Sequence, residues 1–422
     1  MLVFLKRIVP RSIVRFFGPF YHWALARLAA YWYGYPSRGM TVIGITGTNG
    51  KSTVVELLAR ILEEARFRVA SVSSIRFKIM DEWWPNELKM TMPGRFFLQR
   101  FLARAKRKGA THAVLEVTSQ GIKQFRHCGI DWDVLLLTNI TREHIEAHGS
   151  FEKYQKTKEK VFEQLEKTYR KEEIPKIIIV NEDDKHALEF LKYNADKKLR
   201  YSLKNINYIF EKDGMKIMIE DIVIKTKLSG EFNIYNIMAA VTLARSLNIG
   251  FEEIQRAISK IDSIPGRFEF IQHEPFTVVV DYAHTPDALR KVYETLKNNN
   301  LICVLGAAGG GRDKWKRREL GQIADEFCNE IILTNEDPYD EDPNQILSEI
   351  ESGISAKPVL KILDRKEAIA KAIDDAQRGD NVIITGKGSE PWMMGPKGTK
   401  LPWDDRNITR EVLKARDEVY GL

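Results

Sequence analysis

One stretch near the N-terminus constrains the fold more than any other part of the chain. The apolar run 42–45 leads into Thr46-Gly47-Thr48-Asn49-Gly50-Lys51-Ser52-Thr53, and an apolar periodic segment follows at 54–64. This order is typical of a strand that turns into a helix around a phosphate group, because glycines let backbone amides face an anion and the helix offers its positive end. Lys51 is placed to reach terminal phosphates and Ser52 to face Mg²⁺. The sequence therefore predicts a nucleotide-binding loop.

This loop departs from the general phosphate-loop pattern at one position. The pattern G-x-x-x-x-G-K-[ST] has glycine where this chain has Ile45. The remaining T-G-T-N-G-K-S-T is a narrower form, found in one superfamily of ATP-dependent amide ligases. The alternative is a glycine turn that binds nothing, which explains the lysine and the hydroxyls less well. The residues expected to contact the nucleotide are Gly47, Thr48, Asn49, Gly50, Lys51, Ser52 and Thr53.

Length and composition indicate an ordinary globular protein. With 422 residues, 44% of them hydrophobic, we expect two or three domains. The formal net charge of +7 permits anionic partners, including nucleotides, phospholipids and nucleic acids. No RNA-binding motif, zinc-finger spacing or long arginine-rich arm supports nucleic acid. We expect a monomer whose partners are small molecules.

The cysteines carry little information by themselves. Cys128, Cys303 and Cys328 are scattered, with neither metal-ligand nor disulfide spacing. We therefore expect free thiols in a reducing compartment, the cytoplasm.

The first 38 residues differ from the rest because they are crowded with aromatic and basic side chains. No charge-free stretch approaches the ~20 apolar residues that span a bilayer, and no cleavage site follows. Gly18-Pro19 splits the segment, so we favour a helical hairpin packed on the body of the protein. The alternative is peripheral contact of residues 1–35 with a membrane, at the inner membrane face. The packed hairpin predicts no strong binding to anionic vesicles.

From residue 41 onward short β-rich runs alternate with amphipathic helices, which is typical of mostly parallel α/β domains. An alternating segment at 208–228 predicts an antiparallel hairpin instead. The break Ser263-Ile264-Pro265-Gly266 marks the expected domain boundary, and a second α/β series follows it. We expect a helical N-terminal segment (1–38), a central ATP-binding domain with a phosphate-loop-type, mostly parallel sheet (39–263) and a Rossmann-like C-terminal α/β domain (264–422).

Polar side chains follow two of the predicted strands. Glu116, Ser119 and Gln120 lie at the end of the strand expected at 113–117, while Asn139 and His144 come after 134–138. Open parallel sheets bind ligands beyond the carboxyl ends of their strands. A carboxylate and an imidazole from neighbouring strand ends would suit a divalent cation. In isolation each is more often structural, but the phosphate loop favours the functional interpretation.

A series of further motifs resembles the Mur ligase family, and within it the members that add the third amino acid of a muramoyl peptide. The resemblance covers residues 40 to about 415. The matches besides the loop are Thr91-Met92-Pro93, Glu116-Val117-Thr118-Ser119-Gln120, Thr138-Asn139 through His148-Gly149, Gly230 to Asn236, Pro265-Gly266-Arg267-Phe268-Glu269, Asp281 to Pro286, Gly309 to Asp313, Gly386 to Glu390 and Pro402 to Arg406.

The resemblance implies a chemistry as well as a fold. A substrate carboxylate attacks the γ-phosphate of ATP to give an acyl phosphate, which an amine converts to an amide; the protein neutralises charge and positions the reactants. It implies catalytic roles for Lys51, Glu116, His144, Lys158 and Arg267, and two Mg²⁺ ions held by Ser52, Glu116, His144 and Lys158. Further nucleotide contacts implied are Asn139, Asn236, Arg267 and Asp281. Substrate contacts implied are Thr91, Ser119, Gln120, His284, Asp337, Tyr339, Gly386 and Glu390.

Lys158 stands nine residues after the His148-Gly149 pair, where the family has a carbamylated lysine that ligates a metal. Seen alone, it is one of several lysines on a charged helix expected at 152–167, and a solvated side chain is the alternative. Carbamylation needs a neutral amine, which a low lysine pKa would favour.

Two departures from the family bear on the substrates. The first 38 residues are too short for the domain that grips the uridine end of the donor, so we expect a donor bound through its peptide and muramoyl part, or one carried on a lipid or otherwise modified. In the acceptor motif D-N-P-R, the arginine is replaced by Tyr339 and acidic residues surround it. A free ammonium suits such a site better than a carboxylate does, so we favour lysine or another diamine. The alternative is that these acids cap the helix starting near Pro343.

Three rival interpretations remain. A folylpolyglutamate-type ligase would have D-G-A-H-N where this chain has Asp281-Tyr282-Ala283-His284-Thr285. A ligase that amidates a lipid-linked muramoyl precursor with ammonia would be expected to carry a cysteine-rich zinc insert. A nucleotide-binding, membrane-attached scaffold without activity would not need the combination of Lys51, Glu116, His144 and Lys158.

Overall fold

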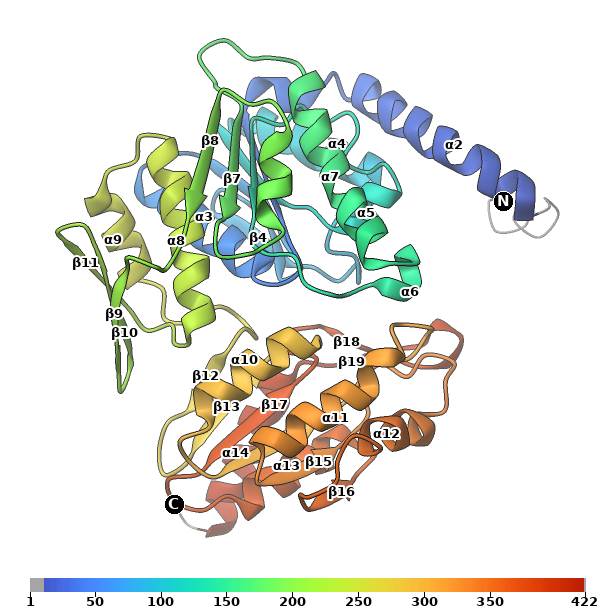
Figure 1. Cartoon of the computed structure of the whole chain (residues 1–422), viewed down its shortest axis with the longest axis vertical. Coiled ribbons are helices and arrows are strands. Elements are labelled where there is room, and N and C mark those ends of the chain that lie inside the picture. The colour runs from blue at the N-terminus through green and yellow to red at the C-terminus, as the bar shows by residue number, and fades with distance from the viewer. Residues whose placement is uncertain (1–10, 421–422) are drawn as a thin grey trace. The chain divides into compact units, whose positions relative to one another are not determined.

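The computed structural model describes residues 11–420. Contacts divide the chain into two compact units, which are described one at a time (Figure 1). Unit 1 comprises Met1–Ile140, Glu152–Asn205 and Tyr235–Ala257, and unit 2 comprises Thr141–Phe151, Ile206–Ile234 and Ile258–Leu422.

Unit 1 is built on one sheet with the strand order β4-β3-β2-β5-β1-β6-β7-β8. The six strands from β2 to β8 in that order are parallel, and β3 and β4 form an antiparallel extension at one edge. The strands are β1 (Thr41–Thr46), β2 (Val69–Val72), β3 (Arg76–Ile79), β4 (Glu82–Pro85), β5 (His112–Glu116), β6 (Val134–Leu137), β7 (Ile177–Asn181) and β8 (Lys197–Tyr201).

The central strands read as apolar runs because both faces of the sheet are covered. Every residue of β1, β5, β6 and β7 is buried, as expected for a parallel sheet between helices. Figure 1 shows α3 and α7 beside this sheet. The helices of this part of the chain are α2 (Arg11–Trp32), η1 (Pro36–Gly39), α3 (Lys51–Glu64), α4 (Arg95–Arg107), α5 (Ser119–Lys123), α7 (Phe151–Lys167), η2 (Ala187–Lys192), α8 (Glu231–Ser246) and α9 (Phe251–Ser259).

The predicted N-terminal hairpin is wrong. A single helix, α2, runs through Gly18-Pro19 without a turn. Proline removes one helical hydrogen bond and bends a helix, but neighbouring turns on both sides can keep it continuous. Within the described residues, no helix is long and apolar enough to cross a membrane.

Unit 2 contains a six-stranded sheet with the order β12-β13-β17-β14-β15-β16. All neighbours are parallel except β12 and β13. Its strands are β12 (Glu269–Gln272), β13 (Thr277–Asp281), β14 (Leu301–Leu305), β15 (Glu330–Leu333), β16 (Val359–Lys361) and β17 (Asn381–Thr385), and its helices are α6 (Ile145–His148), α10 (Pro286–Leu296), α11 (Trp315–Phe327), α12 (Pro343–Glu351), α13 (Arg365–Asp375), η3 (Pro396–Gly398) and α14 (Asp405–Tyr420).

Two small antiparallel sheets complete this unit. The predicted hairpin is a three-stranded meander of β9 (Asn207–Glu211), β10 (Gly214–Ile219) and β11 (Ile222–Thr226), while β18 (Trp392–Met394) pairs with β19 (Lys400–Pro402). The two large, mostly parallel sheets confirm the predicted α/β fold class. The domain limits at 38 and 263 stay predictions.

The expectation of three free thiols is also wrong. Cys303 and Cys328 form a disulfide with 6.1 Å between their Cα atoms, and Cys128 is free. Cys303 lies in β14, and Cys328 follows α11 just before the neighbouring strand β15. The fold brings them within bonding range, which their separation of 25 residues did not indicate.

Candidate active site

The phosphate loop follows β1, between two strands whose ends also carry functional residues. β1 pairs with β5 on one side and β6 on the other. The chain crosses from β1 toward β2 on one side and later reaches β6 on the other, which makes this position the switch point of the sheet. Doubly wound sheets bind ligands at such points. Glu116 ends β5 and Asn139 follows β6, so both lie at strand ends, as predicted, on either side of β1.

Two glycines of this loop are required by their surroundings. Gly47 has φ 144°, and a Cβ atom there would lie 1.9 Å from the Thr138 hydroxyl oxygen. Gly50 has φ 82°, and a Cβ there would lie 2.2 Å from the Asn236 side-chain oxygen. Positive φ together with this crowding excludes other residues. The predicted site residue Asn236, on α8, therefore lies against the loop.

The residues after β6 hold the loop in place. The Thr138 hydroxyl donates to the Asn49 carbonyl oxygen at 2.7 Å, and the Asn139 side-chain oxygen accepts from the Asn49 amide at 2.9 Å. The Thr48 amide donates to the Asn139 carbonyl oxygen at 2.9 Å. The loop is thus preorganised by the neighbouring strand. Lys51 lies beside it, with its Nζ 2.7 Å from the Thr48 carbonyl oxygen and 3.9 Å from a Glu116 oxygen.

Ser52 and Glu116 converge beneath the loop. The Ser52 hydroxyl donates to Glu116 Oε2 at 2.7 Å, although 64 residues separate them. Ser74 joins them, because its amide donates to the same oxygen at 2.9 Å and its hydroxyl lies 2.7 Å from that of Ser52. This cluster offers carboxylate and hydroxyl oxygens beside a phosphate site, the ligand type that Mg²⁺ prefers. Ser74 follows β2 in a loop without a motif, so no pattern in the sequence indicated its role.

Lys158 is buried rather than solvated. Only 1% of the residue is exposed, and its Nζ donates to the Gly47 carbonyl oxygen at 2.7 Å and to the Thr46 hydroxyl at 3.3 Å. Burial, with Lys51 nearby, lowers the lysine pKa well below its ordinary value, while Glu116 opposes that shift. The alternative of a solvated side chain is wrong, because Lys158 is buried.

Tyr154 is a further residue that the sequence reasoning missed. Its hydroxyl lies 3.0 Å from that of Thr48, and its ring lies 5.0 Å from the Lys158 nitrogen. Tyr154 stands one turn before Lys158 on α7, so the same helix face supplies both. The spacing of four residues between Tyr154 and Lys158 could have indicated that they share a helix face.

Three of the predicted substrate residues lie before or in the first turn of two helices of unit 1, α4 and α5. Thr91 precedes α4 and is half-buried, Ser119 is buried in the first turn of α5, and Gln120 beside it is exposed. Arg126 donates to the Met92 carbonyl oxygen, and the Thr118 hydroxyl caps α5 by accepting from the Gly121 amide. These contacts order both segments.

Segment 141–151 groups with unit 2, where His144 lies beside Glu143 and Asp313. The ligand atoms of these three side chains lie within 4.8 Å of one another. Asp313 accepts from the His144 amide at 2.7 Å, and Glu143 pairs with Lys316 at 3.0 Å. The structure thus surrounds His144 with carboxylates.

The predicted nucleotide residues of unit 2 have defined local partners. The Arg267 guanidinium lies 4.1 Å from the centre of the Tyr282 ring. Asp281 accepts from the amides of Phe268 and Ala283 at 2.6 Å each, so it fixes the backbone around Arg267. Burial raises the Asp281 pKa, whereas it lowers that of His284 to about 3. His284 is therefore neutral near pH 7.

The predicted acceptor residues gather around a buried lysine. Lys387 Nζ lies 2.8 Å from Asp337 and 2.8 Å from Glu390, and it is fully buried. The Tyr282 hydroxyl also donates to Glu390 at 3.0 Å. These two carboxylates therefore share one buried cation, which the sequence did not reveal.

The other acidic residues between positions 336 and 342 also have hydrogen-bond or ion-pair partners among the described residues, with the exception of Glu336. Asp342 caps α12 by accepting from the Asn344 amide, which confirms the capping alternative for that residue. Glu341 pairs with Arg317 and Lys314, and Asp340 accepts from the Lys397 amide.

Glu336 differs because its Oε2 is buried and has no hydrogen-bond partner among the described residues. It lies between Gly306 and Gly386, the residues after β14 and β17, and a Cβ on Gly386 would lie 2.6 Å from this oxygen. The predicted substrate residue Gly386 thus makes room for Glu336. Burial and the neighbouring Asp337 raise the Glu336 pKa.

Tyr339 occupies the position of the missing arginine. Its hydroxyl accepts from Arg312 at 3.0 Å, and its backbone has φ 53°. Arg312 therefore places a cation beside Tyr339, the position at which the family motif has an arginine.

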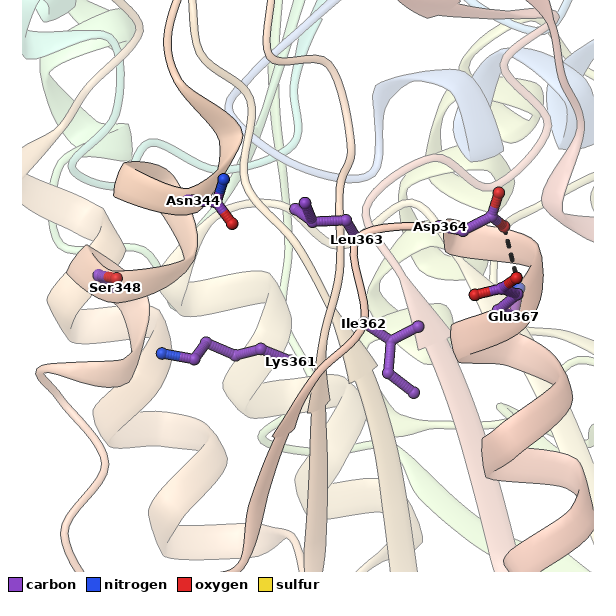
Figure 2. A pocket seen from close by; sticks show the side chains of 7 residues that line it. All are labelled: Asn344, Ser348, Lys361, Ile362, Leu363, Asp364 and Glu367. Atoms are coloured by element: carbon purple, nitrogen blue, oxygen red, sulfur yellow. Dashed lines mark hydrogen bonds between the residues drawn. The ribbon is translucent and has the colours of Figure 1, made fainter.

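A surface pocket of about 480 Å³ lies elsewhere in unit 2. Figure 2 shows Asn344 and Ser348 on α12 facing Lys361 and the loop that leads to α13. None of the predicted site residues lines this pocket.

The phosphate loop, the oxygen cluster beneath it and the two parallel α/β sheets define a nucleotide-binding enzyme with two α/β units. The chain matches the Mur ligase middle domain over residues 45–244 and the Mur ligase glutamate ligase domain over 266–388. It is 34% identical over 408 residues to the UDP-N-acetylmuramoyl-L-alanyl-D-glutamate–2,6-diaminopimelate ligase of Halalkalibacterium halodurans, covering 93% of this chain and 82% of the relative.

Solved structures agree with this match. A ligase of the same name is 30% identical with a TM-score of 0.61, covering 92% of this chain and 82% of that one. The folylpolyglutamate synthase of Mycobacterium tuberculosis, at 17% identity and a TM-score of 0.70, covers 86% of this chain and 92% of its own and shares the fold. The chain belongs to the Mur ligase family. The predicted resemblance is confirmed, and the chain is an ATP-dependent ligase.

Proposed function

We propose that this ligase joins an amino acid with a second amino group to a muramoyl-peptide precursor of the cell wall, through an acyl phosphate. The observation that carries the proposal is the convergence of Ser52, Glu116 and Lys158 on the phosphate loop. The names of the relatives support a muramoyl dipeptide donor. The individual residue roles given below are part of the proposal.

ATP binding is proposed for the loop of unit 1. Its amides and Lys51 hold the β- and γ-phosphates, and Asn139 and Asn236 keep the loop in its binding form. Arg267 is proposed as a further nucleotide contact, and Asp281 supports it through the backbone. Most of the rate enhancement then comes from charge neutralisation and positioning.

Mg²⁺ is the expected cofactor, and the residues of unit 1 fit it. Ser52 and Glu116 supply hard oxygen ligands beside the phosphate site. When bound, the ion neutralises charge on the phosphates. A second ion is proposed at His144, which the nearby Glu143 and Asp313 support.

Lys158 is proposed to carry a carbamate. Its amine is buried and its pKa is lowered, so more of it is in the neutral form that reacts with CO₂ than in an ordinary lysine. The neutral nitrogen attacks the carbon of CO₂ and loses a proton, which leaves an anion with two oxygens in place of the amine. Such a group would complement Lys51 and offer metal ligands.

The acceptor is proposed to be lysine or another diamine, held by Glu336. Asp337 and Glu390 share the cation of Lys387, whereas the buried Oε2 of Glu336 has no hydrogen-bond partner among the described residues. A buried carboxylate without a partner is costly, and an ammonium group would satisfy it. Arg312, beside Tyr339, is available for the acceptor's carboxylate.

The deciding experiment measures ATP hydrolysis with the full chain. We expect phosphate release only when a muramoyl-L-alanyl-D-glutamate donor and an amino acid are both present, with lysine preferred over diaminopimelate. Donors carrying UDP, a lipid pyrophosphate or no carrier are compared to identify the carrier. Turnover that depends on folate would support the folylpolyglutamate alternative, and no substrate-dependent turnover would support a scaffold. A preference for diaminopimelate over lysine would contradict the proposed acceptor but not the proposed ligase function.

A further inference from the structure

The helix α2 has two opposite faces of different character. His22, Ala26, Ala29, Ala30 and Tyr33 recur at helical spacing, and the three alanines among them are fully buried. This face packs on α4, where Arg95 lies 2.9 Å from the His22 ring nitrogen. The close approach is tight, since a Cβ on Gly129 would lie 2.8 Å from that of Ala30. The helix is therefore anchored to unit 1 by one side.

The other face of α2 is exposed and strongly apolar. Two rows at helical spacing form it: Phe20, Trp23, Arg27 and Tyr31 in one, and Tyr21, Leu28 and Trp32 in the other. Tyr31 and Trp32, at the C-terminal end of α2, are 71% and 74% exposed. In Figure 1 the opposite end of α2, marked N, extends away from the other elements of this unit. Large contiguous apolar surfaces of this kind indicate an interaction site.

Charge indicates which partner suits this face. The chain carries no aspartate or glutamate before Glu56, whereas Lys6, Arg7, Arg11, Arg15, Arg27 and Arg38 are cationic. The helix α4, on which α2 packs, has five basic residues and no acidic residue, and four of them are exposed: Arg100, Arg104, Lys106 and Arg107. One of these four, Arg104, is paired with Glu82. The surroundings of the aromatic face are thus suited to an anionic surface.

We propose that α2 binds to an anionic phospholipid surface, with its aromatic face in the headgroup region. Tryptophan and tyrosine favour this region because their rings are apolar and their polar atoms remain hydrated. The helix lies on the membrane and does not cross it, which agrees with its composition. A nucleic acid is a poorer partner, because Arg27 is the one cation within the exposed apolar rows.

This proposal differs from the expectation based on sequence, which placed the aromatic residues in a packed hairpin. The reason is the continuous helix: it can bury one side on α4, but its other side is left exposed. The proposal is independent of the substrates of the ligase.

The test is cosedimentation of the full chain with phosphatidylcholine vesicles, with and without phosphatidylglycerol. We expect binding to the anionic vesicles that weakens with added salt, and little binding to the neutral ones. Brominated lipids should quench tryptophan fluorescence, because Trp23 and Trp32 enter the lipid. Equal binding to both kinds of vesicle, or no binding, would overturn the proposal.

Matched variants locate the surface. The double variant Tyr31→Ser/Trp32→Ser should lower vesicle partitioning by at least about tenfold, because it removes two rings that insert into the membrane. The control Ile209→Ser/Phe210→Ser removes two apolar side chains of β9 that are 56% and 51% exposed, and it should bind normally. Arg27→Glu should weaken binding about tenfold, whereas the exposed control Arg378→Glu should not.

Two other occupants of this face give distinct results. If a second copy of the chain covers it, sedimentation velocity shows a dimer that Tyr31→Ser/Trp32→Ser dissociates, without vesicle binding. If single-stranded RNA is the partner, RNA binds and is lost in the same variant while vesicles do not bind. Either result would overturn the proposal.

Discussion

Lys158 donates a hydrogen bond of 2.7 Å to the carbonyl oxygen of Gly47, across 111 residues of sequence. This contact places a buried amine against the phosphate loop and links α7 to the turn after β1. The amine is therefore not solvated, and its burial, together with the nearby Lys51, lowers its pKa. The most specific prediction concerns this residue.

Lys158→Ala should nearly abolish ligation, and added bicarbonate should not restore it, because no amine remains to form a carbamate. In the unchanged protein, ¹³C-labelled bicarbonate should give a carbamate signal by NMR that the variant lacks. The control Lys156→Ala removes an exposed lysine of the same helix and should keep both activity and signal. Near-normal turnover of Lys158→Ala would refute the assignment.

Gly47→Ala should weaken ATP binding by more than about tenfold, since a side chain at this φ is strained and its Cβ would meet Thr138. Isothermal titration with a non-hydrolysable ATP analogue measures the loss. Gly94→Ala is the matched control, because a Cβ there meets nothing within 4 Å. Equal affinities in the two variants would contradict the loop assignment.

Glu336→Gln should raise KM for the amino acid acceptor at least about tenfold, while KM for ATP stays the same, because a charged hydrogen bond to the acceptor ammonium is lost. The control Asp340→Asn alters an exposed acid of the same run. If Glu336 served only to stabilise unit 2, the melting temperature would fall without a selective change in the acceptor's KM.

His127 should make the protein less stable as pH falls from 7 to 5. Burial lowers its pKa from 6.5 to about 3 in the folded state, so in this window the unfolded chain binds a proton that the folded protein does not. The free energy of unfolding should drop by about 2 kcal/mol from this group. His127→Phe should remove that part of the pH dependence in guanidinium titrations. His273→Gln, at an exposed position, should leave it intact.

The disulfide between Cys303 and Cys328 should stabilise unit 2. Closing a loop of 25 residues restricts the unfolded chain and contributes about 3 kcal/mol. Cys303→Ala/Cys328→Ala should lower the guanidinium midpoint, and a reducing agent should then have no further effect on it. Cys128→Ala should leave the response to reductant unchanged. An identical midpoint with and without the disulfide would contradict this expectation.

Local patterns in the sequence predicted much of the fold. The predicted strands 113–117 and 134–138 agree with β5 and β6 to within one residue at each end, because buried parallel strands are short apolar runs between polar turns. The glycine loop was predicted because its conformation depends on residues next to one another in the chain. The strands β4 and β19 were missed, because neither has a buried face that would give it a pattern.

In the candidate site, too, some features follow from local sequence and others only from the tertiary structure. By itself, the sequence determined the phosphate loop, the presence of Glu116 and Asn139 at strand ends, and the family to which the chain belongs. Only the tertiary structure decided that Lys158 is buried, that Asp337 and Glu390 share the cation of Lys387, that Cys303 bonds to Cys328 and that α2 exposes its aromatic face. These properties depend on which distant residues share a dielectric environment or a surface, and that is set by how the sheets and helices pack.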